Sequence, residues 1–241
     1  ESPNNLDTQY EVYEDGTRYF GNRKDKFRLK FFDLQDSVID IGADIKYFII
    51  AGDVSMDFKA GVSYYYKERD NQISNFEFAP SPTATTLFDE TFRTQPLTEI
   101  FAEQNISPDT WEVNEISGAA DYYDADSEIL AFYAGIDGQF TDSLRLSIGF
   151  RYEDSDINVS NFNKYSKVEN DRSDLALDKV LPAITLTQTL DNNMQIRLGV
   201  SETVVRPNFR ELAQSVFFTP ATNRSFVGNP DLKITEITNL D

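Results

Sequence analysis

The 241-residue chain is acidic, with 41 Asp and Glu against 22 Lys and Arg, a net charge of -19 that excludes nucleic acid as a partner. It contains no Cys and no His, which excludes a disulfide framework, the usual zinc sites and a His-based triad. We therefore expect no metal and no cofactor. The chain is 13% aromatic, and no apolar run is long enough for a spanning helix, so any membrane span must be a β-strand.

Strict alternation of apolar and polar residues predicts β-strands along most of the chain. In residues 144–152, Leu and Ile alternate with Arg145, Ser147 and Arg151. The strands predicted in this way are, in chain order, 28–49, 56–69, 126–140, 144–158, 179–190, 194–206 and the start of a seventh at 233–241. Most are about ten residues or longer, the length that a tilted membrane strand needs.

The predicted connections alternate between short and long, as in outer-membrane barrels with periplasmic turns and extracellular loops. The short turns are expected at Ala51–Asp53, Thr141–Ser143 and Asp191–Asn193, and the long loops at 70–125, 159–178 and 207–232, with 1–26 as the end of another. This alternation of loop lengths predicts that the chain runs from the periplasmic side to the extracellular side in 56–69, 144–158 and 194–206. Tyr64, Tyr65, Tyr66 and Tyr152, at strand ends, fit an interfacial aromatic girdle.

Several loop segments carry signals for helices and turns. Residues 96–103 predict a short helix, and Ser107-Pro108 resembles an N-cap followed by proline at the first helical position. Pro207 is expected to end strand pairing, with a short helical turn over 208–212; alternatively, Arg206-Pro207 shapes a ligand-facing loop. Gly228-Asn229-Pro230 predicts a turn, because Gly and Asn tolerate positive φ and Pro fixes the exit of the chain.

The polar faces of the strands supply the candidate site. Arg145, Arg151 and Arg197 would either contact an anionic ligand or pair with carboxylates such as Asp137. Trp111 and the aromatic residues of the long loop would either stack on a sugar or apolar ligand or pack the loop onto itself. The acidic stretch at Asp154 lacks the Gly and Glu of a calcium loop, and neighbouring carboxylates there are weak evidence for glycoside hydrolysis, so no catalytic residue is expected.

These strands are too few for a barrel with an Arg-lined interior, since eight strands already make a barrel filled by its own side chains. The fold class predicted is therefore all-β: a partial antiparallel transmembrane β-barrel of six to seven strands, with short helices in its extracellular loops. We expect further barrel on both sides and a region N-terminal to it.

Residues 123–133 resemble the start of a strand in the barrels of TonB-dependent outer-membrane receptors. Three further sets of residues resemble the same barrels. They are Arg206-Pro207-Asn208-Phe209-Arg210-Glu211-Leu212, Gly228-Asn229-Pro230-Asp231-Leu232 and the strand that ends in Gly149-Phe150-Arg151-Tyr152-Glu153. The resemblance covers about 120–241, is looser over 25–70 and is absent from 70–125. It implies that residues 1–241 are a segment of a barrel domain of about 22 strands with a plug inside.

The resemblance also implies energised uptake of a scarce ligand, a siderophore or a carbohydrate, across the bacterial outer membrane. The implied partners are outer-membrane lipid and lipopolysaccharide, the protein's own plug domain and a small-molecule or oligosaccharide ligand. The TonB complex is a further implied partner, which would bind through the region N-terminal to the barrel. Asp137, Arg145, Arg151, Arg197, Arg206 and Trp111 are the candidate ligand-binding residues. A soluble all-β carbohydrate-binding module and a structural porin or assembly barrel remain the alternatives.

Overall fold

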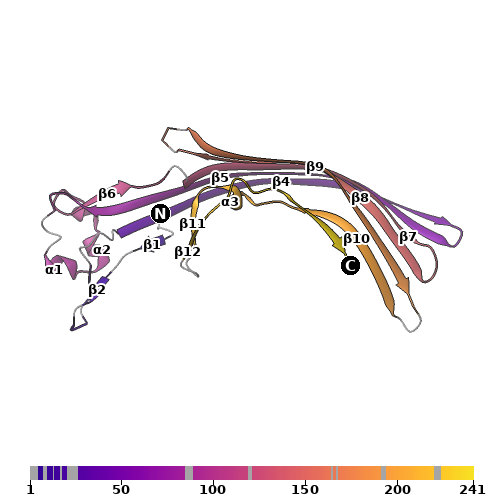
Figure 1. The fold of residues 1–241 in the computed structure, drawn as a ribbon. Coiled ribbons are helices and arrows are strands. Elements are labelled where there is room, and N and C mark those ends of the chain that lie inside the picture. The colour runs from indigo at the N-terminus through magenta and orange to yellow at the C-terminus, as the bar shows by residue number, and fades with distance from the viewer. Residues whose placement is uncertain are drawn as a thin grey trace. The chain divides into compact units, whose positions relative to one another are not determined.

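The computed structural model describes residues 5–7, 10–12, 14–16, 18–20, 27–84, 89–118, 121–163, 165–166, 168–190, 194–219 and 224–241. Its main element is a nine-stranded sheet in the order β1-β4-β5-β7-β8-β9-β10-β13, with β6 paired to β5 (Figure 1). This strand order is a linear path, so the sheet is open within the described residues. The predicted all-β, antiparallel fold is confirmed. Among these residues no helix is long and apolar enough to cross a membrane.

The strands confirm the predicted order, but β4, β5, β8 and β9 are longer than predicted. The long ones are β4 (Phe27–Ala51), β5 (Val54–Pro80), β7 (Tyr122–Gln139), β8 (Leu144–Phe162), β9 (Glu169–Thr189) and β10 (Gln195–Val205), followed by β13 (Thr235–Leu240). The predicted loop over 159–178 is wrong, because β8 and β9 remain paired up to Phe162 and Glu169. The predicted loop over 70–125 is likewise wrong at both ends, which belong to β5 and β7.

The turns predicted at Ala51–Asp53 and Thr141–Ser143 are confirmed, and Gly52 has the positive φ of 64° that a two-residue hairpin requires. Residues 191–193 lie outside the described residues, so the third predicted turn is not tested. The described part of residues 1–26 contains three short strands, β1 (Asn5–Asp7), β2 (Tyr10–Val12) and β3 (Arg18–Phe20). β1 pairs with β4, and β2 pairs with β3.

The chain divides into two compact units. The first comprises 1–34 and 71–122 and contains α1 (Glu90–Arg93), α2 (Leu97–Ile100) and β6 (Trp111–Glu115). The helix predicted over 96–103 is confirmed as the short α2. The helix predicted after Ser107 is wrong: the Thr110 amide donates to the Ser107 carbonyl at 3.0 Å, so these residues form a single turn.

An aromatic cluster forms the core of the first unit. Phe27, Phe78, Ile100 and Trp111 are buried there, with Phe92 and Phe101 packed against them. The Trp111 indole NH donates to the Ile100 carbonyl at 3.2 Å, and the rings of Phe27 and Phe101 stack at 4.0 Å. The loop aromatics thus pack onto one another in this structure, although Phe88 lies outside the described residues.

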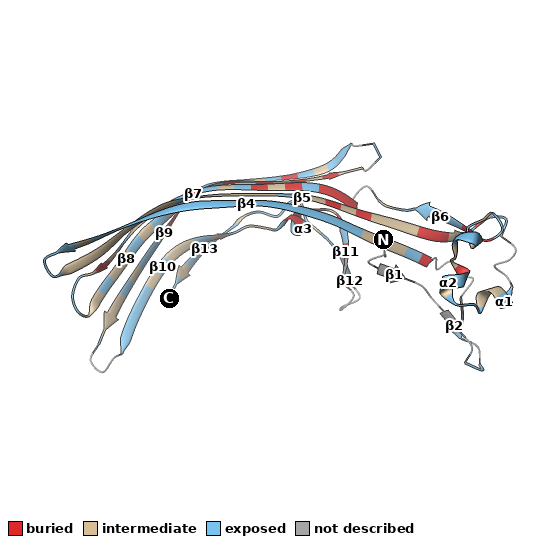
Figure 2. Cartoon of the chain, turned by 180° about the vertical axis from the view of Figure 1, so that it is seen from behind, coloured by how far each residue is buried: buried red, intermediate tan, exposed pale blue. Residues whose placement is uncertain are grey.

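The second unit comprises 35–70 and 123–241, and its strands have one polar and one apolar face. On β7, β8 and β9 the apolar face carries exposed large side chains, among them Phe132, Ile148, Phe150 and Ile184. Figure 2 shows how little of β4 is covered: it is pale blue along most of its length, whereas red marks buried residues on α3. Exposed apolar side chains on one face of a sheet are what a lipid-facing wall presents.

The tyrosines predicted at strand ends lie inside β5 and β8, because both strands continue well beyond them. Tyr64 and Tyr66 lie on the apolar face near Glu128, and Tyr152 lies near Asp178. Tyr65 points to the opposite face, because successive strand residues alternate. Including Tyr65 in the girdle was therefore wrong. Beyond these tyrosines the same face turns acidic, as at the end of an apolar band.

Candidate ligand-facing wall

Two carboxylates organise the polar face of the second unit, and Asp137 on β7 is the first. Arg145 on the paired strand β8 donates to it twice, from Nε at 2.7 Å and from Nη2 at 2.5 Å. Ser147 Oγ donates at 3.0 Å, and Lys59 Nζ on β5 lies 3.7 Å away. The predicted pairing of Arg145 with Asp137 is confirmed.

Glu153 on β8 is the second carboxylate, and it holds two arginines. Arg151 donates to it from Nε at 2.5 Å, and Arg206 from Nη2 at 2.6 Å. Arg206 also donates to Ser155 Oγ at 3.2 Å, and Arg151 donates to Ser63 Oγ at 3.2 Å. The side chains of Glu153 and Arg206 are only 10% and 17% exposed, so Arg206 is tied to the wall 53 positions away in sequence.

A shallow pocket of about 330 Å³ lies between these two groups. Lys59, Tyr133, Asp137, Ser147, Arg151 and Thr185 contribute to its lining. Gly135 and Gly149 face each other across β7 and β8 and also line it. Since glycine has no side chain, the polar groups around the pair can reach a bound molecule without obstruction.

Arg197 completes the wall on β10. It pairs in register with Thr187 on β9, which pairs in turn with Arg145 on β8, so both arginines flank the same threonine. Among the described residues Arg197 has no ion-pair partner, unlike Arg145. Asp137 pairs with Lys59 and Arg145, and Glu153 pairs with Arg151 and Arg206, whereas Arg197 adds a fifth cationic side chain to this wall. These five cationic side chains outnumber the two carboxylates that they surround, while Asp57 on the same face pairs with Lys46 and Asp44 accepts a hydrogen bond from Tyr133.

The α3 segment (206–219 and 224–232) folds against this polar face. Its helix α3 (Phe209–Leu212), predicted over 208–212, has a full capping box between Asn208 and Glu211. The Gln214 amide donates to Asn161 Oδ1 at 3.0 Å, and Ser173 Oγ donates to the Pro230 carbonyl at 2.9 Å. A hairpin of β11 (Val216–Thr219) and β12 (Arg224–Val227) follows the helix.

Charged side chains on the sheet contact the α3 helix through its residue Phe209. The buried Phe209 ring has Lys67 Nζ and Arg69 Cζ each 5.7 Å from its centroid. Arg69 binds both oxygens of Asp36 at 2.6 Å. Burial raises the pKa of the Tyr123 hydroxyl beside them, and the Arg69 guanidinium opposes this rise.

The turn at Gly228 is confirmed, but the predicted reason for its glycine is wrong. Gly228 is not among the positive-φ glycines. A Cβ there would lie 2.1 Å from the Ala213 carbonyl and 2.7 Å from that of Glu211. The Asn229 amide donates to the Glu211 carbonyl at 2.6 Å, so glycine is needed for close approach to the end of α3.

The structure thus brings together Asp137 with Arg145 and Arg151 with Arg206, and it places Arg197 on the same wall. Trp111 belongs to the other unit, where it is 4% exposed, so a ligand could not reach its ring without opening the aromatic cluster. Lys59, Tyr133 and Ser147 were not among the predicted site residues. Alternation placed Lys59 on a polar face, but only strand register brings it to Asp137.

Comparisons with known proteins agree with a barrel wall. No curated protein matches the chain. Among solved structures, the chain is similar to the crystal structure of the ferric citrate transporter FecA in the unliganded form, at 13% identity and a TM-score of 0.47. That match covers 78% of this chain and 22% of FecA. The model of the outer membrane protein beta-barrel family matches residues 91–241. The chain therefore belongs to the outer membrane protein β-barrel family, and its location is the bacterial outer membrane.

Proposed function

We propose that this chain is a wall segment of a TonB-dependent receptor that takes up a scarce ligand, a siderophore or a carbohydrate, through a plugged barrel. The observation that carries the proposal is the cluster of cationic side chains on the polar face of a membrane β-sheet, Lys59, Arg145, Arg151, Arg197 and Arg206. The polar groups of Lys59, Tyr133 and Ser147 would add directional contacts for a ligand.

The charge of this wall favours an anionic ligand, such as a carboxylate-bearing metal chelate or an acidic glycan. Within this proposal Arg197 is the main ligand contact, because its guanidinium is not neutralised by a carboxylate of the described strands. Arg145 and Arg151 would contribute through donors that Asp137 and Glu153 leave unused, since a guanidinium has five N–H groups. The plug domain and the TonB complex are partners within the same proposal.

Uptake by cells tests the function. A strain lacking the gene should lose growth on a limiting anionic iron chelate or a limiting glycan, and the substrate that separates mutant from parent identifies the ligand class. Complementation with Arg197→Gln should lower ligand uptake by about tenfold or more, in keeping with the loss of one charge-assisted contact. Thr187→Ala, on the adjoining strand, is the control that should support parental uptake. Growth of the deletion strain on every scarce ligand tested would refute the proposal.

A soluble carbohydrate-binding module is not supported. Such a module buries the apolar face of each sheet against a second sheet. Here Ile148, Phe150 and Ile196 are 49–51% exposed, and the two other described sheets have only two strands each. An apolar face of this kind requires lipid or detergent.

A further inference from the structure

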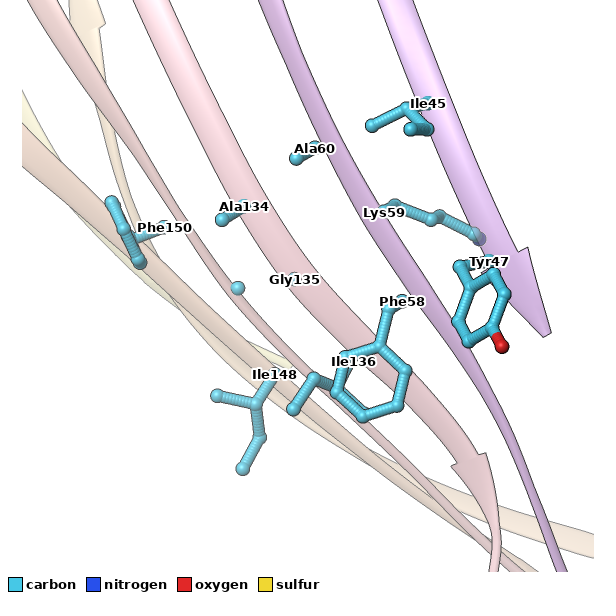
Figure 3. Close-up of a pocket in the computed structure, with 11 residues that line it drawn as sticks. Ile45, Tyr47, Phe58, Lys59, Ala60, Ala134, Gly135, Ile136, Ile148 and Phe150 are labelled. Atoms are coloured by element: carbon cyan, nitrogen blue, oxygen red, sulfur yellow. The ribbon is translucent and has the colours of Figure 1, made fainter. Parts of the chain in front are cut away.

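The apolar face of the second unit contains a groove (Figure 3). Ala60 on β5 and Ala134 on β7 lie near its centre. Ile45 and Tyr47 border it on the β4 side, and Ile148 and Phe150 on the β8 side. Phe58 and Ile136 lie next to each other at one end of it. Its volume is about 440 Å³.

The groove follows from the side-chain sizes on neighbouring strands. Outward positions on either side of Ala134 carry Phe132 and Ile136, and those beside Ala60 carry Phe58 and Val62. Two adjacent alanines thus leave a hollow, while the large side chains around them stand as walls. Gly135 and Gly149 contribute only backbone to this region, because their Cα–H bonds point to the opposite, polar face.

The distance of the groove from the short turns indicates which leaflet of the membrane it faces. Tyr47, Phe58, Ile136 and Ile148 each lie five positions from the nearest turn residue, at 52, 53, 141 and 143 respectively. Ala60 and Ala134 each lie seven positions away. With strands rising about 3.3 Å per residue at a tilt of about 45°, the groove lies roughly 12–16 Å from the short turns. If these turns are periplasmic, the groove lies in the periplasmic leaflet and reaches the bilayer centre.

We propose that this groove binds one acyl chain of a phospholipid from the periplasmic leaflet. The groove is continuous with the exposed apolar band, which is the membrane interface of an outer-membrane barrel. Its lining is almost wholly hydrocarbon, and its volume is comparable with that of a single saturated acyl chain. A second copy of this chain is a poorer fit, because a stable protein interface buries roughly 1,200 Å² or more and the groove is only two alanines wide.

Native mass spectrometry of the full-length protein in detergent tests the proposal. Delipidated protein is titrated with dipalmitoyl phosphatidylethanolamine, and the mass identifies what remains bound. We expect one retained phospholipid per protein. Ala134→Leu and Ala60→Leu fill the hollow from two strands, and each should weaken retention by about tenfold, as expected if roughly two methylene groups are excluded.

Val200→Leu places the same final side chain on the apolar face outside the groove, with one added carbon instead of three, so it should retain phospholipid like the parent. Phe150→Ala removes one wall without filling the hollow and should also weaken retention. Folding of each variant is verified by heat-modifiable electrophoresis, and Phe150→Ala tests the site if both alanine variants fail to fold. Equal retention by parent and folded groove variants would overturn the proposal. So would retention of lipopolysaccharide in place of phospholipid, or a dimer that the groove variants abolish.

Discussion

Gly228 shows how one residue fixes the α3 segment. Its Cα lies so close to three carbonyls at the end of α3 that a methyl group would meet backbone atoms at 2.1–2.8 Å. Backbone cannot rotate away as a flexible side chain can. Gly228→Ala should therefore detach the turn from α3 and cost about 1–3 kcal/mol of local stability. Hydrogen exchange at Phe209–Leu212 measures the loss.

Gly199→Ala is the matched control for this substitution, because the nearest atoms to a Cβ at Gly199 are 3.8 Å away. It should leave exchange at α3 unchanged. If Gly228→Ala also left exchange unchanged, the close packing of the turn against α3 would be disproved.

Glu153 decides whether Arg206 stays on the wall. Glu153→Gln removes the charge that holds both Arg151 and Arg206, and it leaves two guanidinium groups side by side. We expect the free energy of local unfolding of the α3 segment to fall by about 1.5–3 kcal/mol, the range for hydrogen bonds to charged groups. Faster proteolysis near Arg206 would report it. Asp137→Asn removes the other carboxylate of the wall and should leave cleavage there at the parental rate.

At the scale of the strand, acidic residues directly opposite one another work against pairing. Asp154 faces Asp178 across β8 and β9, and Glu128 faces Asp156 across β7 and β8. Like charges in such positions destabilise a sheet. Asp178→Asn should therefore raise the free energy of unfolding by about 0.2–1 kcal/mol. Urea unfolding in lipid vesicles measures this gain.

Salt distinguishes repulsion from other causes. Because salt screens exposed charges, the gain from Asp178→Asn should shrink as ionic strength rises. Asp142→Asn, which removes one charge in a short turn, should have little effect at any salt concentration. A gain that persisted in high salt would show that repulsion between Asp154 and Asp178 was not its source.

The same strands explain what the sequence could predict. Within the apolar band, lipid on one face and polar surroundings on the other enforce alternation, so β10 was predicted within a residue at either end. Beyond the band both faces meet polar surroundings, and 169–178 of β9 alternates too weakly to be recognised. Strand order and turns were therefore predictable, whereas strand ends were not.

The site was predictable only in part for a similar reason. Alternation identifies polar-face residues such as Arg145 and Arg197, but it contains no information on register between distant strands. The approach of Arg206 to Glu153 depends on the path of the chain through Pro207 and α3. The burial of Trp111 depends on a cluster assembled from β4, β5, α2 and β6.

For the whole molecule, a charged side chain is destabilising on the apolar face of the sheet and tolerated on the polar face. Neighbouring residues on β9 test this difference. Ala183 lies on the polar face and lines the pocket beside Thr185, whereas Ile184 lies on the apolar face and is 42% exposed. Ile184→Arg should lower the free energy of unfolding in a bilayer by about 2–4 kcal/mol, the cost of an arginine facing lipid near the midplane. Ala183→Arg adds the same side chain one position away, toward water, and should change stability far less. Unfolding of both variants in phospholipid vesicles gives the comparison, and equal losses would show that lipid does not cover the face assigned to it.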